Sequence, residues 1–241
     1  MSSPKSNRAL SAVELDQFGQ ELDALRARTV AELGERDAKY IRRIVKAVRY
    51  LEVAGRVTLF ASLPFASAFW PLWIIGVLLL ALSKILENME LGHNVIHGQY
   101  DWMGDPHLNG QTYEWDIAGT SDNWRHTHNF RHHTYTNVRG MDDDIGYGLL
   151  RIFPEQRWRP FYLFQPIIAV VFALLFEWGV AIQNLKLGRW WAGKTTKAQM
   201  RKAFRPAGKK MLRQVLKDYV VFPLLAGPFF LPILLGNVVA N

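Results

Sequence analysis

All seven histidines of this chain lie between positions 93 and 133, and their spacing indicates metal binding. His93 and His97 are four residues apart, which places two rings on one face of a helix, one turn apart. His128 and His132 repeat this spacing, and His133 adds a third ring. Neutral imidazole ligates zinc, copper, iron and nickel. Five clustered rings exceed the three or four protein ligands of one zinc, so the pattern indicates more than one metal ion.

The remaining polar residues near these histidines are weaker candidates. His126 precedes His128 by only two residues, so as a sixth ligand it would point elsewhere on a helix. His107 lies in a predicted loop, and we interpret it as an ordinary surface residue. The acidic run 142–144 is typical of a helix N-cap or a solvated turn rather than of iron ligands. Asn94 stands where a zinc metalloprotease helix carries its glutamate base, which excludes that class.

Composition places these histidines in an apolar chain. Its 241 residues are 49% hydrophobic and 13% aromatic, and the apolar residues are gathered in blocks, which indicates a membrane protein with soluble segments. The net charge of +8 therefore fits an anionic membrane face, and we expect no nucleic-acid partner. There is no cysteine, which excludes disulfides, thiolate metal sites and cysteine nucleophiles. The first 50 residues carry no secretory signal.

The segments before the histidines must bring them to a membrane surface. Residues 10–52 have the apolar spacing of amphipathic helices. The basic flank 39–56 adjoins the uncharged block 57–82, which places that flank on the cytoplasmic side. We predict a helical hairpin that turns near Phe69–Pro71, and this hairpin returns the histidines to the cytoplasm. A single span is the alternative, and it would leave them outside.

The later blocks follow from that topology. Block 161–185 is apolar but contains polar residues and a proline, and with the histidines inside it must lie in the interface or re-enter. The stretch 186–217 holds eleven Lys or Arg and no acid, a strong positive-inside signal. It is either such a loop or a docking face for an acidic donor, anionic headgroups or a CoA phosphate. The last block, 219–241, is interrupted by prolines and glycines.

At the histidine boxes the sequence resembles the membrane fatty acid desaturases, most closely the bacterial acyl-CoA desaturases. The resemblance runs from about Val13 to Asn241 and rests on "ENMELGHNVIHGQYDWMGDP", "WRHTHNFRHHTYTN", "RGMDDDIGYGLLR" and "FEWGVA". It implies two irons in a histidine cage, activation of O2, and removal of two hydrogens from a fatty acyl chain. The iron ligands that it implies are His93, His97, His128, His132 and His133.

The chain departs from this family in one respect. The family has a third box, His-x-x-His-His, and this chain has no histidine after His133. The resemblance therefore implies an incomplete ligand set, and we expect residues 1–241 alone to lack desaturase activity. The predicted fold is an all-α integral membrane protein, truncated before the final helices, with a hairpin, interfacial helices and a cytoplasmic cap bearing the boxes. Residues 1–56 would form N-terminal cytoplasmic amphipathic helices, and 57–241 an incomplete membrane desaturase-type domain.

The resemblance also implies partners. The substrate would be a fatty acyl-CoA or acyl-lipid, in fatty acid biosynthesis at the inner membrane, with O2 as co-substrate. The sequence has no dinucleotide fingerprint, cysteine cluster or haem motif, so a separate reductase or ferredoxin would supply electrons. Trp102, Trp115, Trp124 and Tyr135 would line an acyl tunnel or simply pack near the interface. The alternative functions are a His-box di-iron hydroxylase and a non-catalytic membrane fragment.

Overall fold

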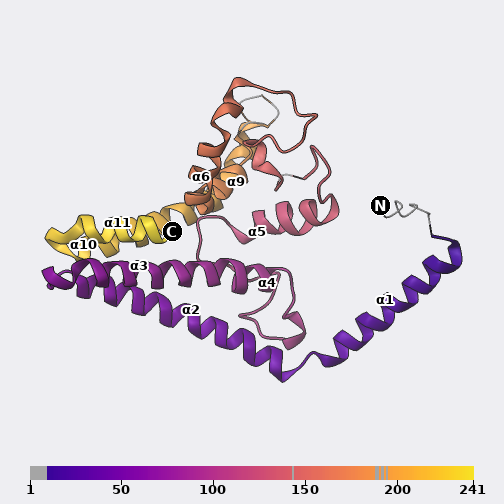
Figure 1. Ribbon diagram of the computed structural model, residues 1–241, viewed down its shortest axis with the longest axis horizontal. Helices are drawn as coiled ribbons and strands as arrows, with labels where there is room; N and C mark the ends of the chain where they lie inside the picture. Colours follow the sequence, from indigo (N-terminus) through magenta and orange to yellow (C-terminus); the bar gives the residue numbers. More distant parts are fainter. Residues whose placement is uncertain (1–9, 143, 188–189, 191–192, 194) are drawn as a thin grey trace, which may run out of the picture. The chain divides into compact units, whose positions relative to one another are not determined.

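The structure is a computed structural model that describes residues 10–142, 144–187, 190, 193 and 195–241. Within these residues the regular secondary structure is helical and includes no strand, which confirms the all-α prediction. The label η denotes short 3-10 or π segments. The elements in chain order are α1 (Ala12–Glu32), α2 (Glu35–Ser62), η1 (Ala66–Ala68), α3 (Phe69–Ile85), η2 (Leu86–Gly92), α4 (His93–Ile96), η3 (Asp101–Met103), α5 (Ser121–Trp124), η4 (Arg125–His132), η5 (Gly146–Gly148), η6 (Pro160–Phe164), α6 (Gln165–Leu174), α7 (Phe176–Gln183), α9 (Lys197–Gln214), η7 (Val215–Val221), α10 (Phe222–Leu225), η8 (Gly227–Phe229) and α11 (Phe230–Ala240) (Figure 1).

The chain forms two compact units, Met1–Arg42 and Arg43–Asn241. In the first unit, α1 begins at a capping box in which Ser11 Oγ accepts from the Glu14 N–H at 3.3 Å. The Glu14 carboxylate in turn accepts from the Ser11 N–H at 2.7 Å. Two backbone N–H groups at the start of the helix therefore have hydrogen-bond partners within its first turn. The two units meet inside α2, after Arg42. The domain boundary predicted after residue 56 marks where the chain would enter a membrane, and it stays a prediction.

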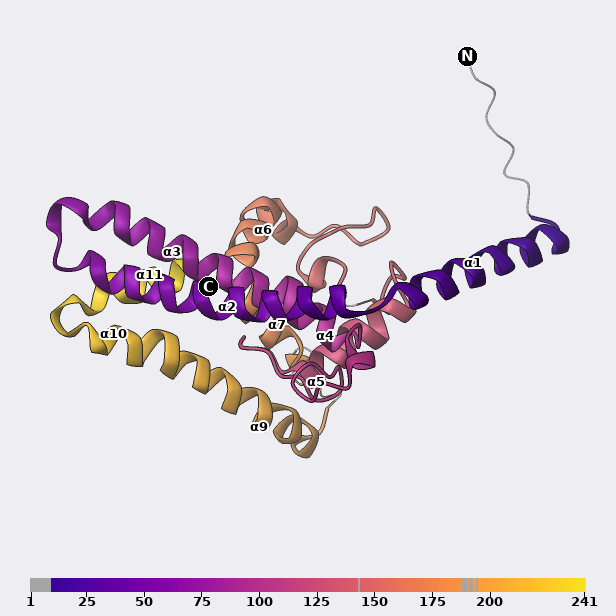
Figure 2. The same ribbon diagram turned by 90° about the horizontal axis from the view of Figure 1, so that it is seen from below.

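The second unit is built on a hairpin of α2 and α3, which run side by side (Figures 1 and 2). The connection lies at residues 63–68, so the turn predicted near Phe69–Pro71 is several residues too late. Pro71 instead sits in the first turn of α3, where its missing N–H removes no helical hydrogen bond. The first arm of the hairpin is the end of the 28-residue helix α2.

Close packing holds the hairpin together. A Cβ on Gly55 would lie 2.8 Å from Leu80 Cγ, and one on Gly76 would lie 2.8 Å from Leu59 Cγ. Only glycine at these two positions lets the backbones approach so closely. Near the other end, Ser83 Oγ donates to the Val48 carbonyl at 2.8 Å. The hairpin therefore carries α3 rigidly to the point where the first histidine box begins.

The C-terminal block 219–241 is itself bent back. The chain turns through η8, where Gly227 has a φ of +56°, and α11 then returns against α3. Trp73 Nε1 donates to the Pro232 carbonyl at 2.9 Å, and Ile233 is buried with residues of the α2–α3 hairpin. This block is thus two short elements rather than one straight membrane helix.

The apolar helices differ in how far each could reach across a membrane. Among the described residues one continuous helix, Ala66–Ile96, is long and apolar enough to cross. The pair Pro160–Leu174 and Phe176–Gln183 would count as a second span only if taken together, and it is bent by 97°. Such a bend suits a segment that is broken or re-enters, which is the behaviour expected of block 161–185.

Candidate metal centre

Two π-helical turns present the histidine boxes. The α3 helix continues through the π segment η2 into α4, which begins at His93. The second box lies largely within η4, a π segment that runs from Arg125 to His132. Each π turn widens the helix by one residue and shifts the side chains that follow it, and such turns are frequent at functional sites.

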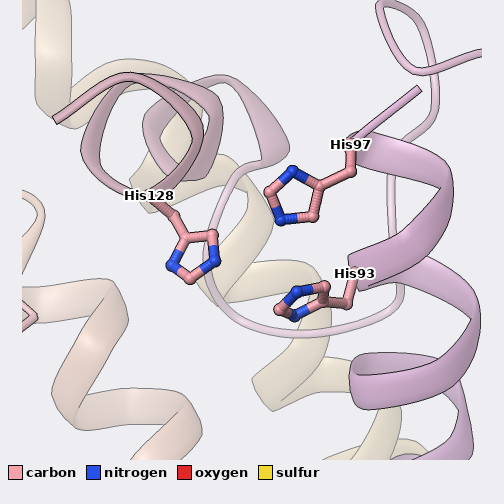
Figure 3. A group of neighbouring side chains, drawn as sticks. All are labelled: His93, His97 and His128. Atoms are coloured by element: carbon pink, nitrogen blue, oxygen red, sulfur yellow. The ribbon is translucent and has the colours of Figure 1, made fainter. Parts of the chain in front are cut away.

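Rings from both boxes meet between these elements. The ring centroids of His93 and His97 are 4.8 Å apart, and those of His93 and His128 are 5.1 Å apart. The three rings point toward one another, two from α4 and its end and one from η4 (Figure 3). Their ligating nitrogens all lie within 4.8 Å of one another, a spacing that suits a single metal ion.

The other two histidines of the second box join the same cluster. The His132 ring lies 5.0 Å from the His128 ring, and the His133 ring lies 4.8 Å from the His97 ring. His126, by contrast, is exposed and stacks on Phe130 at 6.0 Å. His107 is exposed as well, in the loop after η3. The structure therefore brings together the five histidines that the boxes contain and leaves the other two outside.

Two carboxylates hold rings of the second box. His128 Nδ1 lies 2.7 Å from Asp144 Oδ2, and His132 Nδ1 lies 3.0 Å from both oxygens of Asp142. When Nδ1 donates to a carboxylate, Nε2 keeps its lone pair for a metal, which is the usual arrangement behind ligating histidines. His128, His132 and Asp144 also form a second group whose ligating atoms lie within 4.8 Å of one another.

The sequence interpretation of this acidic run was wrong for Asp142. Its side chain is buried, and it also accepts the backbone N–H groups of Asn137 at 3.0 Å and Asp144 at 2.9 Å. Burial alone would raise the pKa of Asp142, but these hydrogen bonds and the His132 ring lower it. Asp143 lies outside the described residues. Acidic residues shortly after a histidine box were the signal that could have revealed these partners.

The electrostatics of the cluster favour neutral rings. Burial, followed by the neighbouring rings of His93, His128 and His133, lowers the pKa of His97 to about 4. Burial and the rings of His128 and His132 lower the pKa of His133 as well. Only neutral imidazole has a lone pair to offer a metal, so these rings are ready to ligate at neutral pH.

An indole forms one wall of the cluster. The Trp124 ring stacks on His128 at 4.2 Å with an interplanar angle of 20°, and its centroid is 5.2 Å from those of both His93 and His97. Trp115 is buried behind Trp124 at 5.3 Å. Both indoles are buried against neighbouring side chains, which is the packing role offered above as the alternative to lining an acyl tunnel. Trp102 is 43% exposed.

The donor set fits a transition-metal ion. Two three-residue groups share His128, and together they offer imidazole nitrogens and one carboxylate, which are ligands that iron accepts. If iron is bound, His93, His97, His128, His132 and His133 would hold it, and Asp142 and Asp144 would orient two of the rings.

Comparisons with known proteins agree with this chemistry. The family model described as fatty acid desaturase matches residues 68–241. The chain is 45% identical over 235 residues to an NADPH-dependent stearoyl-CoA 9-desaturase of Mycobacterium tuberculosis, and the match covers 96% of the chain and 54% of that relative. It is 37% identical over 105 residues to an sn-1 linoleoyl-lipid 6-desaturase of Synechocystis sp., covering 42% of the chain and 28% of that relative.

The chain spans about half the length of the first of these curated relatives. No solved structure gives a significant match. The histidine boxes, which the structure gathers into one cluster, lie inside the region that the family model matches. The chain belongs to the fatty acid desaturase family.

Proposed function

We propose that this chain forms the larger part of the metal centre of a membrane-bound, O2-dependent fatty acyl desaturase. The observation that carries the proposal is the convergence of five imidazoles from two boxes, with carboxylates behind two of them. In this proposal His93, His97, His128, His132 and His133 ligate a di-iron centre. Residues beyond this chain would complete the ligand set.

The residues of the cluster suit an oxidation. A bound pair of irons supplies the power to break unactivated C–H bonds, which no side chain can supply. Forming one double bond while O2 becomes two water molecules also consumes two electrons and two protons. The sequence has no dinucleotide fingerprint, cysteine cluster or haem motif, so in this proposal a separate reductase or ferredoxin delivers the electrons. The related mycobacterial protein is named as NADPH-dependent, which is consistent with such a donor.

A cavity beside the second box offers room for an acyl substrate. It has a volume of about 1100 Å³, and its lining includes Asp142, the partner of His132. Tyr147 and Phe172 form an apolar part of the wall, whereas Arg139 and Arg157 make another part cationic. A long acyl chain with an anionic head group, as in an acyl-CoA or an acyl-lipid, matches that combination.

The function is tested by supplying the part of the mycobacterial relative that this chain does not cover. Residues 1–241 would be fused to that part and expressed with a competent reductase in a desaturase-deficient host. We expect unsaturated acyl chains in the lipid extract and none with His128→Ala in the same fusion. Hydroxylated chains instead of alkenes would indicate the hydroxylase alternative. An iron-loaded fusion that yields neither product would support the non-catalytic alternative.

The proposed site requires the α2–α3 hairpin to sit in the inner membrane with both boxes in the cytoplasm. The absence of cysteine permits a direct test with single cysteines at exposed positions. Gln111→Cys, in the loop between the boxes, should react with a membrane-impermeant thiol reagent only after cell lysis. Gln20→Cys in α1 is the matched cytoplasmic control. If Gln111→Cys reacts in intact cells, the single-span topology is right and the hairpin insertion is wrong.

A further inference from the structure

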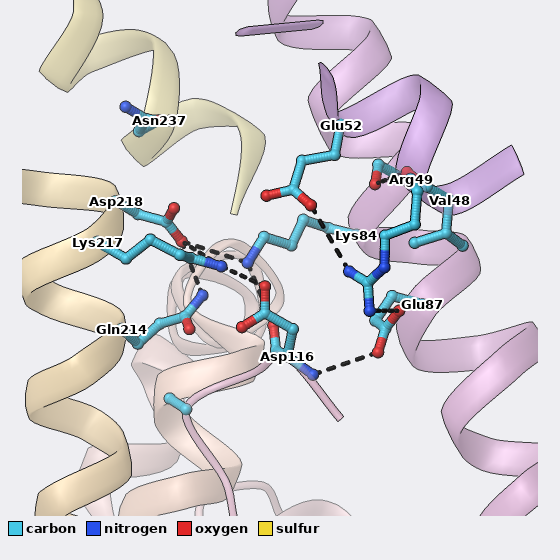
Figure 4. A network of polar contacts seen from close by, with 12 residues as sticks. Val48, Arg49, Glu52, Lys84, Glu87, Asp116, Gln214, Lys217, Asp218 and Asn237 are labelled. Atoms are coloured by element: carbon cyan, nitrogen blue, oxygen red, sulfur yellow. Dashed lines mark hydrogen bonds and ion pairs between the residues drawn. The ribbon is translucent and has the colours of Figure 1, made fainter. Parts of the chain in front are cut away.

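A buried carboxylate lies six residues before the first histidine box. Glu87, in η2, is 3% exposed. Its Oε1 accepts the Tyr113 hydroxyl at 3.1 Å and the Asp116 N–H at 3.3 Å. Its Oε2 lies 4.0 Å from Arg49 Nη2 and accepts no hydrogen bond from the described residues (Figure 4). A buried carboxylate with one poorly satisfied oxygen costs stability, so stability alone does not account for it.

The two groups that Glu87 binds flank a tryptophan. Tyr113 precedes Trp115 by two residues, and Asp116 follows it directly. Trp115 Nε1 donates to the Gly119 carbonyl at 2.8 Å, which fixes the other side of the same loop. The indole lies directly on Gly92, because a Cβ there would be 2.8 Å from Trp115 Cε3. Glu87 thus ties this loop to the helix that leads into His93.

Trp115 then supports the wall of the histidine cluster. It packs against Trp124 at 5.3 Å, and both indoles belong to one buried cluster with Ile96. Trp124 in turn contacts the rings of His93 and His97 at 5.2 Å. Among the described residues, no side chain hydrogen-bonds either of those two rings. Packing against Trp124 and against the neighbouring histidine rings therefore restrains how they are oriented.

We propose that Glu87 is a positioning residue for the metal centre, acting through the loop 113–116 and the Trp115–Trp124 pair on the first histidine box. The inference rests on the proposed function only in taking the histidine cluster as a metal site. It adds a residue that touches neither metal nor substrate. It also explains why a carboxylate occupies a buried position where an apolar side chain would avoid the free-energy cost of removing a charge from water.

The same loop is also held by two lysines, one on η7 and one on α3. Lys217 pairs with the Asp116 carboxylate, and Lys84 Nζ donates to the Asp116 carbonyl at 3.3 Å. Lys84 also lies 3.3 Å from Asp218, which Arg56 pairs at 2.7 Å (Figure 4). Lys84 and Glu87 both belong to the continuous helix Ala66–Ile96, so both join the loop to the helix that bears the first box, and Glu87 does so three residues closer to His93.

The test compares metal affinity with folding stability in the purified chain. Glu87→Met removes both acceptor oxygens at similar volume, and Glu87→Gln keeps one acceptor for Tyr113 and Asp116. Co²⁺ serves as the probe, because its visible absorption reports ligand geometry, and its affinity is measured by competition with a chelator. Glu52→Met is the matched control: Glu52 pairs with Arg49 and Arg56 in the same network and shares Arg49 with Glu87, but it makes neither of the two hydrogen bonds by which Glu87 holds the loop.

We expect Glu87→Met to weaken Co²⁺ binding roughly 10-fold, the lower end of what residues behind metal ligands contribute, and to change the visible spectrum. Glu87→Gln should keep most of the wild-type affinity and spectrum. Tyr113→Phe should weaken Co²⁺ binding in the same direction but by less. Glu52→Met should lower the melting temperature without changing affinity or spectrum. These results together would support the positioning role.

Two results would overturn it. If Glu87→Met binds Co²⁺ like the wild type, or if Glu52→Met weakens binding equally, Glu87 acts only on stability. Should Glu87→Met fail to fold, Tyr113→Phe decides, and unchanged affinity there rejects the inference. A wild-type chain that binds no Co²⁺ at all would instead contradict the proposed metal centre, so the two failures are distinguishable.

Discussion

The two histidine boxes share a spacing, but different contacts hold their rings. In the second box, His128 and His132 each direct Nδ1 at a carboxylate, at 2.7 and 3.0 Å. In the first box, no carboxylate among the described residues hydrogen-bonds His93 or His97, and these rings are held by packing against Trp124, on which His128 also stacks. A carboxylate fixes both the tautomer and the rotation of a ring, whereas an indole limits only its rotation. We infer that the second box is preorganised by hydrogen bonds and the first by packing.

The largest effect should come from the ring that both candidate ligand groups share. His128 belongs to both three-residue groups, so His128→Ala removes a ligand whichever group holds the ion. We expect loss of at least ~100-fold in Co²⁺ affinity, since even residues behind the ligands contribute 10–100-fold. The measurement is chelator competition on the purified chain. His126→Ala is the control, because its ring is exposed two residues away. Equal loss in both variants would argue against a specific centre.

A smaller effect should separate the two boxes. Asp142→Asn keeps the size of the side chain but removes the charge beside His132, and we expect a loss of roughly 10–100-fold in metal affinity. Asp122→Asn is the matched control, because that carboxylate is 90% exposed and pairs only with Arg125 among the described residues. If Asp142→Asn binds metal normally, the second box does not depend on its carboxylate and the contrast between the boxes disappears.

The sequence predicted which rings gather in one cluster better than it predicted what supports them. Helical spacing is a local property, so the shared face of His93 and His97 could be deduced without the fold. The contact of His132 with Asp142 depends on the loop between them folding back, with Asn137 at a φ of +63°. The position of the hairpin turn was missed because Pro71 is compatible with both a turn and the start of a helix. The bend between α6 and α7 was not located for a similar reason, because the apolar block 161–185 was compatible with more than one structure.

The smallest expected effect is a pH dependence that concerns the first box alone. The pKa of His97 is lowered to about 4 by burial and by the rings of His93, His128 and His133. An unfolded chain has an ordinary histidine pKa near 6.5, so as pH falls below about 6.5 it takes up the proton before the folded protein does. Above that pH the His97 ring therefore does not lower the free energy of unfolding. As the pH falls toward about 4, the ring lowers the free energy of unfolding of the metal-free protein increasingly.

The measurement is the melting temperature of the metal-free chain, with chelator present, at about pH 7.5 and about pH 5. His97→Gln removes the titrating ring, so its melting temperature should fall less between the two pH values than that of the wild type. We expect a difference of about 2–4 °C, the shift that about 1 kcal/mol produces in a chain of this size, allowing for solvent screening of a half-buried ring. His126→Gln, which alters an exposed ring, should follow the wild type. If His97→Gln and the wild type lose stability in parallel, the His97 ring is not held in the desolvated environment inferred for it.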